Sequence, residues 1–127
     1  MLDRLLKWAA QNLWTQNNPV SSFLGWHPYH NSGIAFGLPV ANSFTVAISA
    51  ILIIGMLALA LLAWKKNNIL PLLGWIYLIG GAISNLTDRI ACGYVIDYLF
   101  ILTGYINIGD VMIMSGLLVL LLGANKK

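Results

Sequence analysis

A run of 20 residues without a single charge, residues 44–63, decides which solvent this chain can fold in. Its sequence is FTVAISAILIIGMLALALLA, which is the length that a helix needs to cross about 30 Å of hydrocarbon. Residues 69–86 (ILPLLGWIYLIGGAISNL) are a second uncharged run, and Pro71 falls in its first turn, where proline is tolerated. We therefore predict two membrane-spanning helices, over residues 44–63 and 69–88.

A third apolar run, residues 111–124, reaches spanning length only if its helix begins near Tyr105. We expect a span over residues 105–124, with Asp110 in its first turns. The composition agrees, because only 9% of the 127 residues are charged, whereas a soluble domain carries about 25%. Charge this sparse cannot cover a water-facing surface, so we expect a single membrane domain.

Two pairs of lysines predict how the spans are oriented. Lys65 and Lys66 follow the first run, and Lys126 and Lys127 end the chain. Because basic residues mark the cytoplasmic ends of spans, the second span runs outward and the last one returns inward. The basic residues lie in pairs beside apolar runs and form no stripe, so we expect no nucleic-acid binding.

The segment before the first long run is harder to place. Residues 15–43 are rich in Asn, Ser, Pro and Gly, and this topology puts them in an outer loop. Residues 2–14 have a helical pattern but are too short to span. We expect this segment to be the remnant of a first span that lacks its cytoplasmic half; the alternative is a helix lying along the membrane interface.

The acidic residues are few and unevenly placed. The chain has no Glu, and three of its four Asp residues fall near the predicted outer ends of spans: Asp88, Asp97 and Asp110. An ionised Asp within a span costs about 2.5–3.5 kcal/mol, so such a residue is a candidate functional group. Two structural alternatives remain, because a carboxylate can pair with Arg89 and Asp110 can cap the start of its helix.

Asp97 and Asp110 flank the link between two predicted elements, so both side chains can reach the same depth. Two neighbouring carboxyl groups share one proton. The ionised group can then deprotonate a water molecule while the protonated group polarises a peptide carbonyl. This is the chemistry of an aspartic peptidase.

Other chemistries fit the sequence less well. Zinc hydrolysis of the H-E-x-x-H type needs a Glu, and His27 and His30 lie in the predicted outer loop. A Ser–Lys nucleophile needs a lysine near the outer face, whereas every lysine here lies at a cytoplasmic end or in the N-terminal segment. A proton path needs polar residues through the depth of the membrane, and the centres of these spans offer almost none.

Several blocks of the chain together resemble bacterial lipoprotein signal peptidase, also called signal peptidase II. Residues 30–36 (HNSGIAF) resemble the family pattern H/R-N-x-G-x-A-F, and residues 80–89 (GGAISNLTDR) resemble G-G-A-x-x-N-x-x-D-R. Residues 95–98 (VIDY) resemble V-x-D-F/Y, and residues 106–110 (INIGD) resemble F-N-x-A-D. At the start of the chain, Leu2-Asp3 with Lys7 resemble L-D-x-x-x-K. The blocks cover nearly the whole chain, which makes the set far more specific than any one of them.

The resemblance implies an all-α membrane protein: a bundle of four spans, the first one short, with a small extracytoplasmic β-cradle formed by residues 15–43. The family cuts the signal peptide from a prolipoprotein just before a diacylglyceryl-modified cysteine, at the outer face of the bacterial inner membrane, and is blocked by the cyclic peptide globomycin. We accordingly expect lipid-modified prolipoprotein and membrane lipids as partners, a monomer, and neither metal nor organic cofactor.

The resemblance also assigns residues. The family's two catalytic aspartates match Asp97 and Asp110. Positions that line or brace its site match seven further residues: Asn31, Asn85, Asp88, Arg89, Asn107, Asp3 and Lys7.

The chain also departs from the family pattern. Gly109 stands where the family has Ala, Ile106 stands where it has Phe, and the link between the two catalytic aspartates is short. Together with the missing half-span, these departures motivate an alternative function: a catalytically impaired paralogue that binds signal peptides or lipid without turnover.

Overall fold

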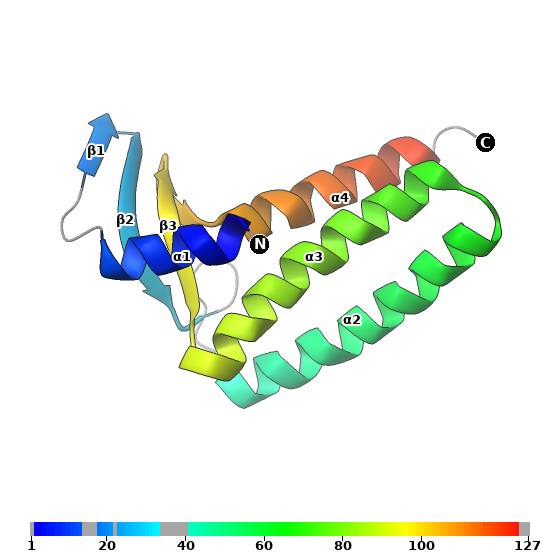
Figure 1. The fold of residues 1–127 in the computed structure, drawn as a ribbon, viewed down its shortest axis with the longest axis horizontal. Helices are drawn as coiled ribbons and strands as arrows, with labels where there is room; N and C mark the ends of the chain where they lie inside the picture. The colour runs from blue at the N-terminus through cyan, green and yellow to red at the C-terminus, as the bar shows by residue number, and fades with distance from the viewer. Residues whose placement is uncertain (1, 14–17, 22, 34–40, 125–127) are drawn as a thin grey trace.

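The computed structural model describes residues 2–13, 18–21, 23–33 and 41–124. Three long helices lie side by side, and a small sheet with one short helix lies at one end of them (Figure 1). The described residues do not include Ile34–Phe36, which end the first motif, or the terminal lysines Lys126 and Lys127.

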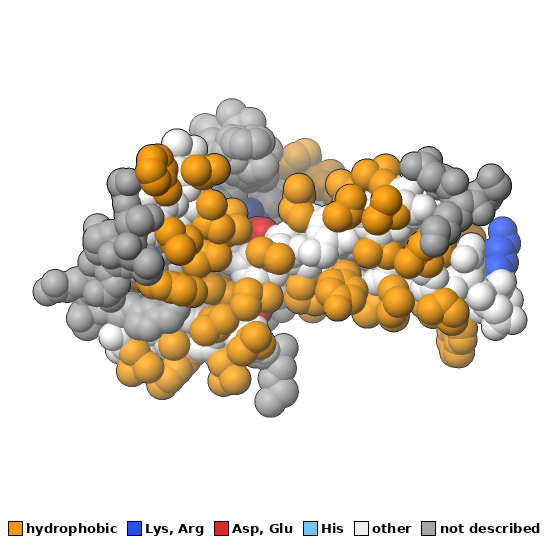
Figure 2. All heavy atoms as spheres, turned by 90° about the horizontal axis from the view of Figure 1, so that it is seen from above, with side chains coloured by type: hydrophobic (Ala, Val, Ile, Leu, Met, Phe, Trp, Pro, Cys, Tyr) orange, Lys and Arg blue, Asp and Glu red, His pale blue; other side chains and the backbone are white. Residues whose placement is uncertain are grey.

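The two long uncharged runs form helices of spanning length. Helix α2 covers Asn42–Lys65 and helix α3 covers Ile69–Cys92, and both are long and apolar enough to cross a membrane. The two helices form a hairpin whose turn is Lys66–Asn68. The sheet lies at the opposite end of this hairpin (Figure 1). Hydrophobic side chains cover the helical part along its length (Figure 2), as expected of a surface that faces lipid.

Helix α4, Ile108–Ala124, is shorter than predicted. The expected start near Tyr105 is wrong, because Gly104–Ile106 form a strand, β4, in which Tyr105 pairs with Phe100. The helix begins after Asn107, whose side-chain oxygen accepts the Asp110 backbone N–H at 3.0 Å. This side-chain bond satisfies a free N–H at the helix start and sets the boundary.

Glycines bring α3 and α4 unusually close. A Cβ added to Gly116 would lie 2.6 Å from the carbonyl oxygen of Gly74, and one added to Gly81 would overlap the carbonyl oxygen of Gly109. Small residues allow helix backbones to approach in this way within membranes. The contact places the end of α3 against the start of α4, where the candidate site lies.

The sheet is antiparallel, with strand order β1-β2-β3-β4. Its strands are β1 Asn18–Ser21, β2 Leu24–Asn31, β3 Val95–Ile101 and β4 Gly104–Ile106. The small cradle is therefore present, but residues 15–43 do not form it alone, because β3 and β4 come from the link between the two predicted spans. This pairing places Tyr29 opposite Asp97 and Asn31 opposite Val95.

Helix α1, Leu2–Asn12, buries charged side chains and exposes apolar ones, which is the reverse of an amphipathic helix in a soluble protein. Its buried residues are Asp3, Lys7 and Ala10, which share one face at helical spacing, whereas Leu2 and Trp8 are exposed. Helix α1 lies against the sheet (Figure 1), and its charged side chains contact Tyr98 on β3 and Asp88 at the end of α3. A helix of this kind docks by polar contacts and leaves its apolar face for lipid.

We expect Gly81→Ala to destabilise the protein by about 1–3 kcal/mol, because its methyl group would meet the backbone of α4, which cannot rotate away. Gly55→Ala is the matched control, since a Cβ at Gly55 meets nothing within 4 Å. Thermal unfolding of both variants in detergent micelles measures the difference. Equal melting temperatures would contradict the close contact between α3 and α4.

Candidate active site

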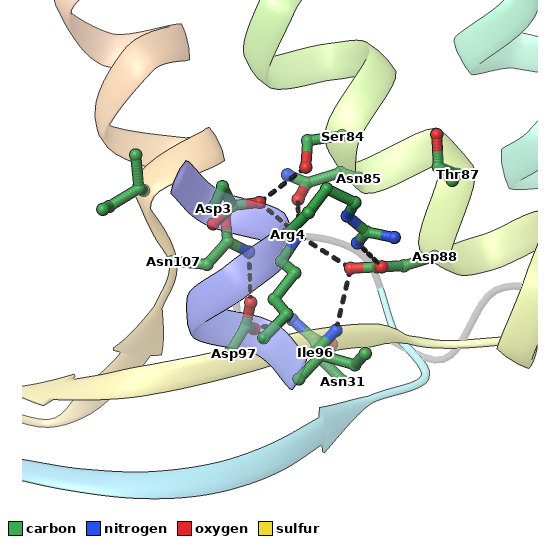
Figure 3. A network of polar contacts seen from close by, with 12 residues as sticks. Asp3, Arg4, Asn31, Ser84, Asn85, Thr87, Asp88, Ile96, Asp97 and Asn107 are labelled. Atoms are coloured by element: carbon green, nitrogen blue, oxygen red, sulfur yellow. Dashed lines mark hydrogen bonds and ion pairs between the residues drawn. The ribbon is translucent and has the colours of Figure 1, made fainter. Parts of the chain in front are cut away.

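All four Asp residues gather where α1, the sheet, and the ends of α3 and α4 meet. Asp3, Asp88 and Asp97 are almost completely buried, and Asp110 is partly buried. Figure 3 shows Asp3, Asp88 and Asp97 around the polar face of α1. The predicted clustering of Asp88, Asp97 and Asp110 near one end of the spans is thus present, and Asp3 joins them from α1.

Asp97 lies on β3 and accepts two side-chain hydrogen bonds. Asn31 Nδ2 on β2 donates to Asp97 Oδ2 at 3.0 Å, and Asn107 Nδ2 donates to Oδ1 at 2.6 Å. Burial raises the pKa of Asp97 to about 6, against the lowering effect of the two amide donors, and the charge of Asp110 adds to the rise. Asp97 therefore holds a proton more readily than an exposed Asp does.

Asp110 lies in the first turn of α4. Its Oδ1 accepts Asn85 Nδ2 at 2.8 Å, and its Oδ2 accepts the Asn107 backbone N–H at 3.0 Å. Since Asn107 Oδ1 accepts the Asp110 N–H in return, the two residues form a reciprocal cap at the helix start. The capping role considered for Asp110 is therefore present, and it still leaves the carboxylate in contact with Asn85 from α3.

Asn107 connects the two carboxyl groups. It is fully buried, its side-chain amide donates to Asp97, and its backbone N–H donates to Asp110. One residue therefore contacts both acids, and the charge of Asp110 acts on Asp97. The position follows from the chain path: the β3–β4 hairpin returns at Ile106 beside Leu99, two residues beyond Asp97.

Cations from α1 balance the remaining acids. Lys7 Nζ lies 2.8 Å from Asp3 Oδ2 and 2.7 Å from Asp88 Oδ2, and Arg4 also pairs with Asp88. Asp88 Oδ2 further accepts the Ile96 backbone N–H at 3.2 Å, which ties β3 to α3 (Figure 3). The network links α1, α3 and the sheet through buried charge.

Arg89 does not have the partner suggested by the sequence. It forms no ion pair with an Asp within the described residues; its Nη2 donates instead to the carbonyl oxygen of Gly33, at 2.8 Å. The predicted ion pair between Arg89 and a carboxylate is therefore not formed among the described residues, although the charges of Asp97 and Asp110 act on its guanidinium. The reason is that two cations from α1, Arg4 and Lys7, already pair with Asp88.

Sequence reasoning missed three members of this network: Arg4, Ser84 and Tyr98. Ser84 Oγ donates to Asp3 Oδ2 at 2.5 Å, and Tyr98 OH donates to Asp3 Oδ1 at 2.9 Å. Ser84 lies four residues before Asp88, so helical spacing could have found it. Burial raises the pKa of Tyr98, which keeps its hydroxyl available as a donor.

The site can supply acid–base groups, whereas nothing described here resembles a metal centre. No group of three or more His, Cys or Asp side chains in the described part of the chain is arranged to hold a metal ion. What the geometry offers is two carboxyl groups joined by Asn107, with amide donors on their oxygens. This arrangement is suited to activating a water molecule between two acids.

We expect Tyr98→Phe to lower the free energy of unfolding by about 1–3 kcal/mol, because the Ile108 N–H, now donating to Tyr98 OH at 3.0 Å, would lose its acceptor and Asp3 would lose a donor. Tyr77→Phe is the control, since Tyr77 is exposed on α3. Chemical denaturation in micelles compares the two variants. A similar loss in both would contradict the importance of this buried hydroxyl.

Comparison with known proteins finds a family to which this chain is similar. A family model described as signal peptidase (SPase) II matches residues 1–125. The lipoprotein signal peptidase of Bartonella tribocorum is 36% identical, with 95% of this chain and 78% of that protein covered. That of Moorella thermoacetica is 30% identical, with coverages of 94% and 82%.

The fold also matches a solved structure. A bacterial membrane enzyme determined by the in meso method at 2.3 Å resolution superimposes with a TM-score of 0.85 over 99% of this chain and 85% of that one. The sequence identity is 22%, so this likeness shows the fold alone. The all-α membrane bundle with a small sheet is thereby confirmed.

Proposed function

The chain belongs to the signal peptidase II family of membrane peptidases, and we propose that it removes signal peptides from diacylglyceryl-modified prolipoproteins with Asp97 and Asp110 as the catalytic pair. The observation that carries this proposal is the fully buried Asn107, which donates one hydrogen bond to each carboxyl group. Asn31 donates a second hydrogen bond to Asp97, and Asn85 donates a second one to Asp110.

In the proposed reaction the two acids have different roles because their surroundings differ. Asp97, whose pKa burial raises to about 6, holds the shared proton, and Asp110 acts as the base. Asp110 takes a proton from water as the water oxygen attacks the peptide carbonyl, and Asp97 gives its proton to the carbonyl oxygen. The C–N bond then breaks: Asp110 passes its proton to the leaving nitrogen, and Asp97 recovers a proton from the gem-diol.

The remaining residues of the predicted site support the two acids without contacting them directly. Lys7 contacts Asn85, which donates to Asp110. Asp88 and Asp3 in turn pair with Lys7. Arg89 holds the backbone at Gly33, two residues after Asn31. These residues brace the acids, and no step of the proposed reaction uses them as a proton carrier.

The placement of the site fits a substrate that lies within a membrane. The acids lie at the end of α2, α3 and α4 opposite the turn that carries Lys65 and Lys66 (Figure 1). A helix of 24 residues is about 36 Å long, so the site and the lysines lie at opposite bilayer faces. With the lysines in the cytoplasm, the site opens at the outer face of the inner membrane. Exposed apolar side chains on all three helices suit contact with lipids and with a signal helix.

We expect Asp97→Asn and Asp110→Asn each to reduce cleavage of a diacylglyceryl-modified prolipoprotein peptide to below about one-thousandth, since each removes a group that carries a proton in the reaction. Thermal unfolding checks that both variants stay folded, and globomycin should inhibit the unmutated chain. Normal processing by either variant would exclude the acid pair. Binding of substrate without turnover by the unmutated chain would indicate the impaired paralogue.

The pH dependence tests which acid holds the proton. As pH rises through about 6, the protonated fraction of Asp97 falls, so kcat/KM should fall as well. Asn31 donates to Asp97 and favours its ionised form, so Asn31→Leu should raise the pKa of Asp97 and move the fall in kcat/KM to higher pH. A shift to lower pH, or none, would assign the proton to another group.

A further inference from the structure

Lys7 uses every hydrogen-bond donor that it has. Its ammonium group contacts Asp3 Oδ2 at 2.8 Å, Asp88 Oδ2 at 2.7 Å and Asn85 Oδ1 at 3.1 Å. An ammonium group has three N–H bonds and no acceptor, so these three oxygens account for all of them. The residue is almost completely buried, at 1% exposed, which leaves it no alternative partner in water.

The third contact fixes the orientation of the Asn85 side chain. Only an oxygen can face an ammonium group as a hydrogen-bond partner, so the amide oxygen must point toward Lys7. The Asn85 NH₂ group then points the opposite way and donates to Asp110 Oδ1 at 2.8 Å. Without Lys7, the amide could rotate and present its oxygen to the carboxylate of Asp110, where two acceptors would repel.

We propose that Lys7 is a positioning residue that acts on Asp110 through the amide of Asn85. The proposal rests on the function proposed above and deepens it, because it connects a residue of α1 to one of the two acids by a single intervening side chain. Its role is directional: it decides which end of the Asn85 amide meets the carboxylate.

The partners of Lys7 separate this role from simple neutralisation of charge. Asp88 retains Arg4 and the Ile96 N–H as donors if Lys7 is removed. Asp3 likewise retains hydroxyl donors from Ser84 and Tyr98. Among the described residues, Lys7 provides the one hydrogen bond to Asn85 Oδ1. Loss of Lys7 therefore affects Asn85 most directly.

Asn31 and Asn107, the other two asparagines of the site, are oriented in the same way, but by backbone N–H donors. The Gly33 N–H donates to Asn31 Oδ1 at 3.1 Å, and the Asp110 N–H donates to Asn107 Oδ1 at 3.0 Å. In both cases the amide oxygen is occupied, and the NH₂ group is directed at Asp97. Asn85 differs in that a side chain, which mutation can remove, performs this task.

Lys7→Met tests the proposal against Arg4→Met as the matched control. Both changes remove a cation that pairs with Asp88, but only Lys7 contacts Asn85. We expect Lys7→Met to lower kcat for a diacylglyceryl-modified prolipoprotein peptide by about 10- to 100-fold, the size of a hydrogen bond to a charged group, with KM within about twofold. Arg4→Met, which leaves the Lys7–Asn85 hydrogen bond in place, should lower kcat by a smaller factor than Lys7→Met does. Equal losses of kcat in both variants would overturn the proposal.

Asn85→Asp keeps the test valid if Lys7→Met does not fold. The new carboxylate can still accept from Lys7, so α1 stays attached to α3, but it offers no N–H to Asp110. We expect kcat to fall by at least about 10-fold, because the amide donor is lost and a second negative charge faces Asp110. Full activity of Asn85→Asp would show that the Lys7–Asn85 contact only joins the helices.

A double variant shows whether the two residues act in series. In an Asn85→Leu background, Lys7→Met should change kcat by less than about twofold, because the amide through which it acts is gone. Independent, additive losses would overturn the proposal. The proposed function fails in a different way, namely if the unmutated chain does not cleave the peptide at all.

Discussion

A buried ammonium group placed between two buried carboxylates determines how α1, α3 and the sheet meet at the functional end of this structure. Lys7 joins α1 to α3 through Asp88, while Asp88 also anchors β3 through the Ile96 N–H. A charge buried without a partner costs several kcal/mol, and one buried with good partners roughly breaks even. The network therefore gives little net stability. Its effect is to specify one arrangement of helix and sheet, because any other arrangement would leave a charge unpaired.

The spans and most of the site could be predicted from the sequence, and the resemblance implied a small β-cradle, but the strands that form it could not be predicted. Uncharged length is a local property, so residues 44–63 and 69–86 identified α2 and α3 directly. The acids were found because an Asp near a span is rare. The pairing of β3 with β2 depends on a partner about 70 residues away in the chain, so no local pattern revealed it. Tyr105 was placed in a helix for the same reason.

Errors within the site also have a spatial cause. Adjacent numbering suggested that Arg89 serves a nearby acid, but the cations that reach Asp88 come from α1, over 80 residues away. A helix points neighbouring residues about 100° apart, so Asp88 and Arg89 face different partners. Motifs identify which residues belong to a site. They do not tell which of them touch.

The two glycine contacts between α3 and α4 have a consequence for how accurately the acids are placed. The pairs Gly74–Gly116 and Gly81–Gly109 are seven residues apart on both helices, so they align together in a single antiparallel register. Sliding one helix by a turn, about 5.4 Å, would set larger side chains against backbone at both points. Asp110 follows Gly109 directly in the chain, so its distance from α3 is set by backbone contact. Changes of loop length elsewhere can then accumulate while the distance of Asp110 from α3 stays constant.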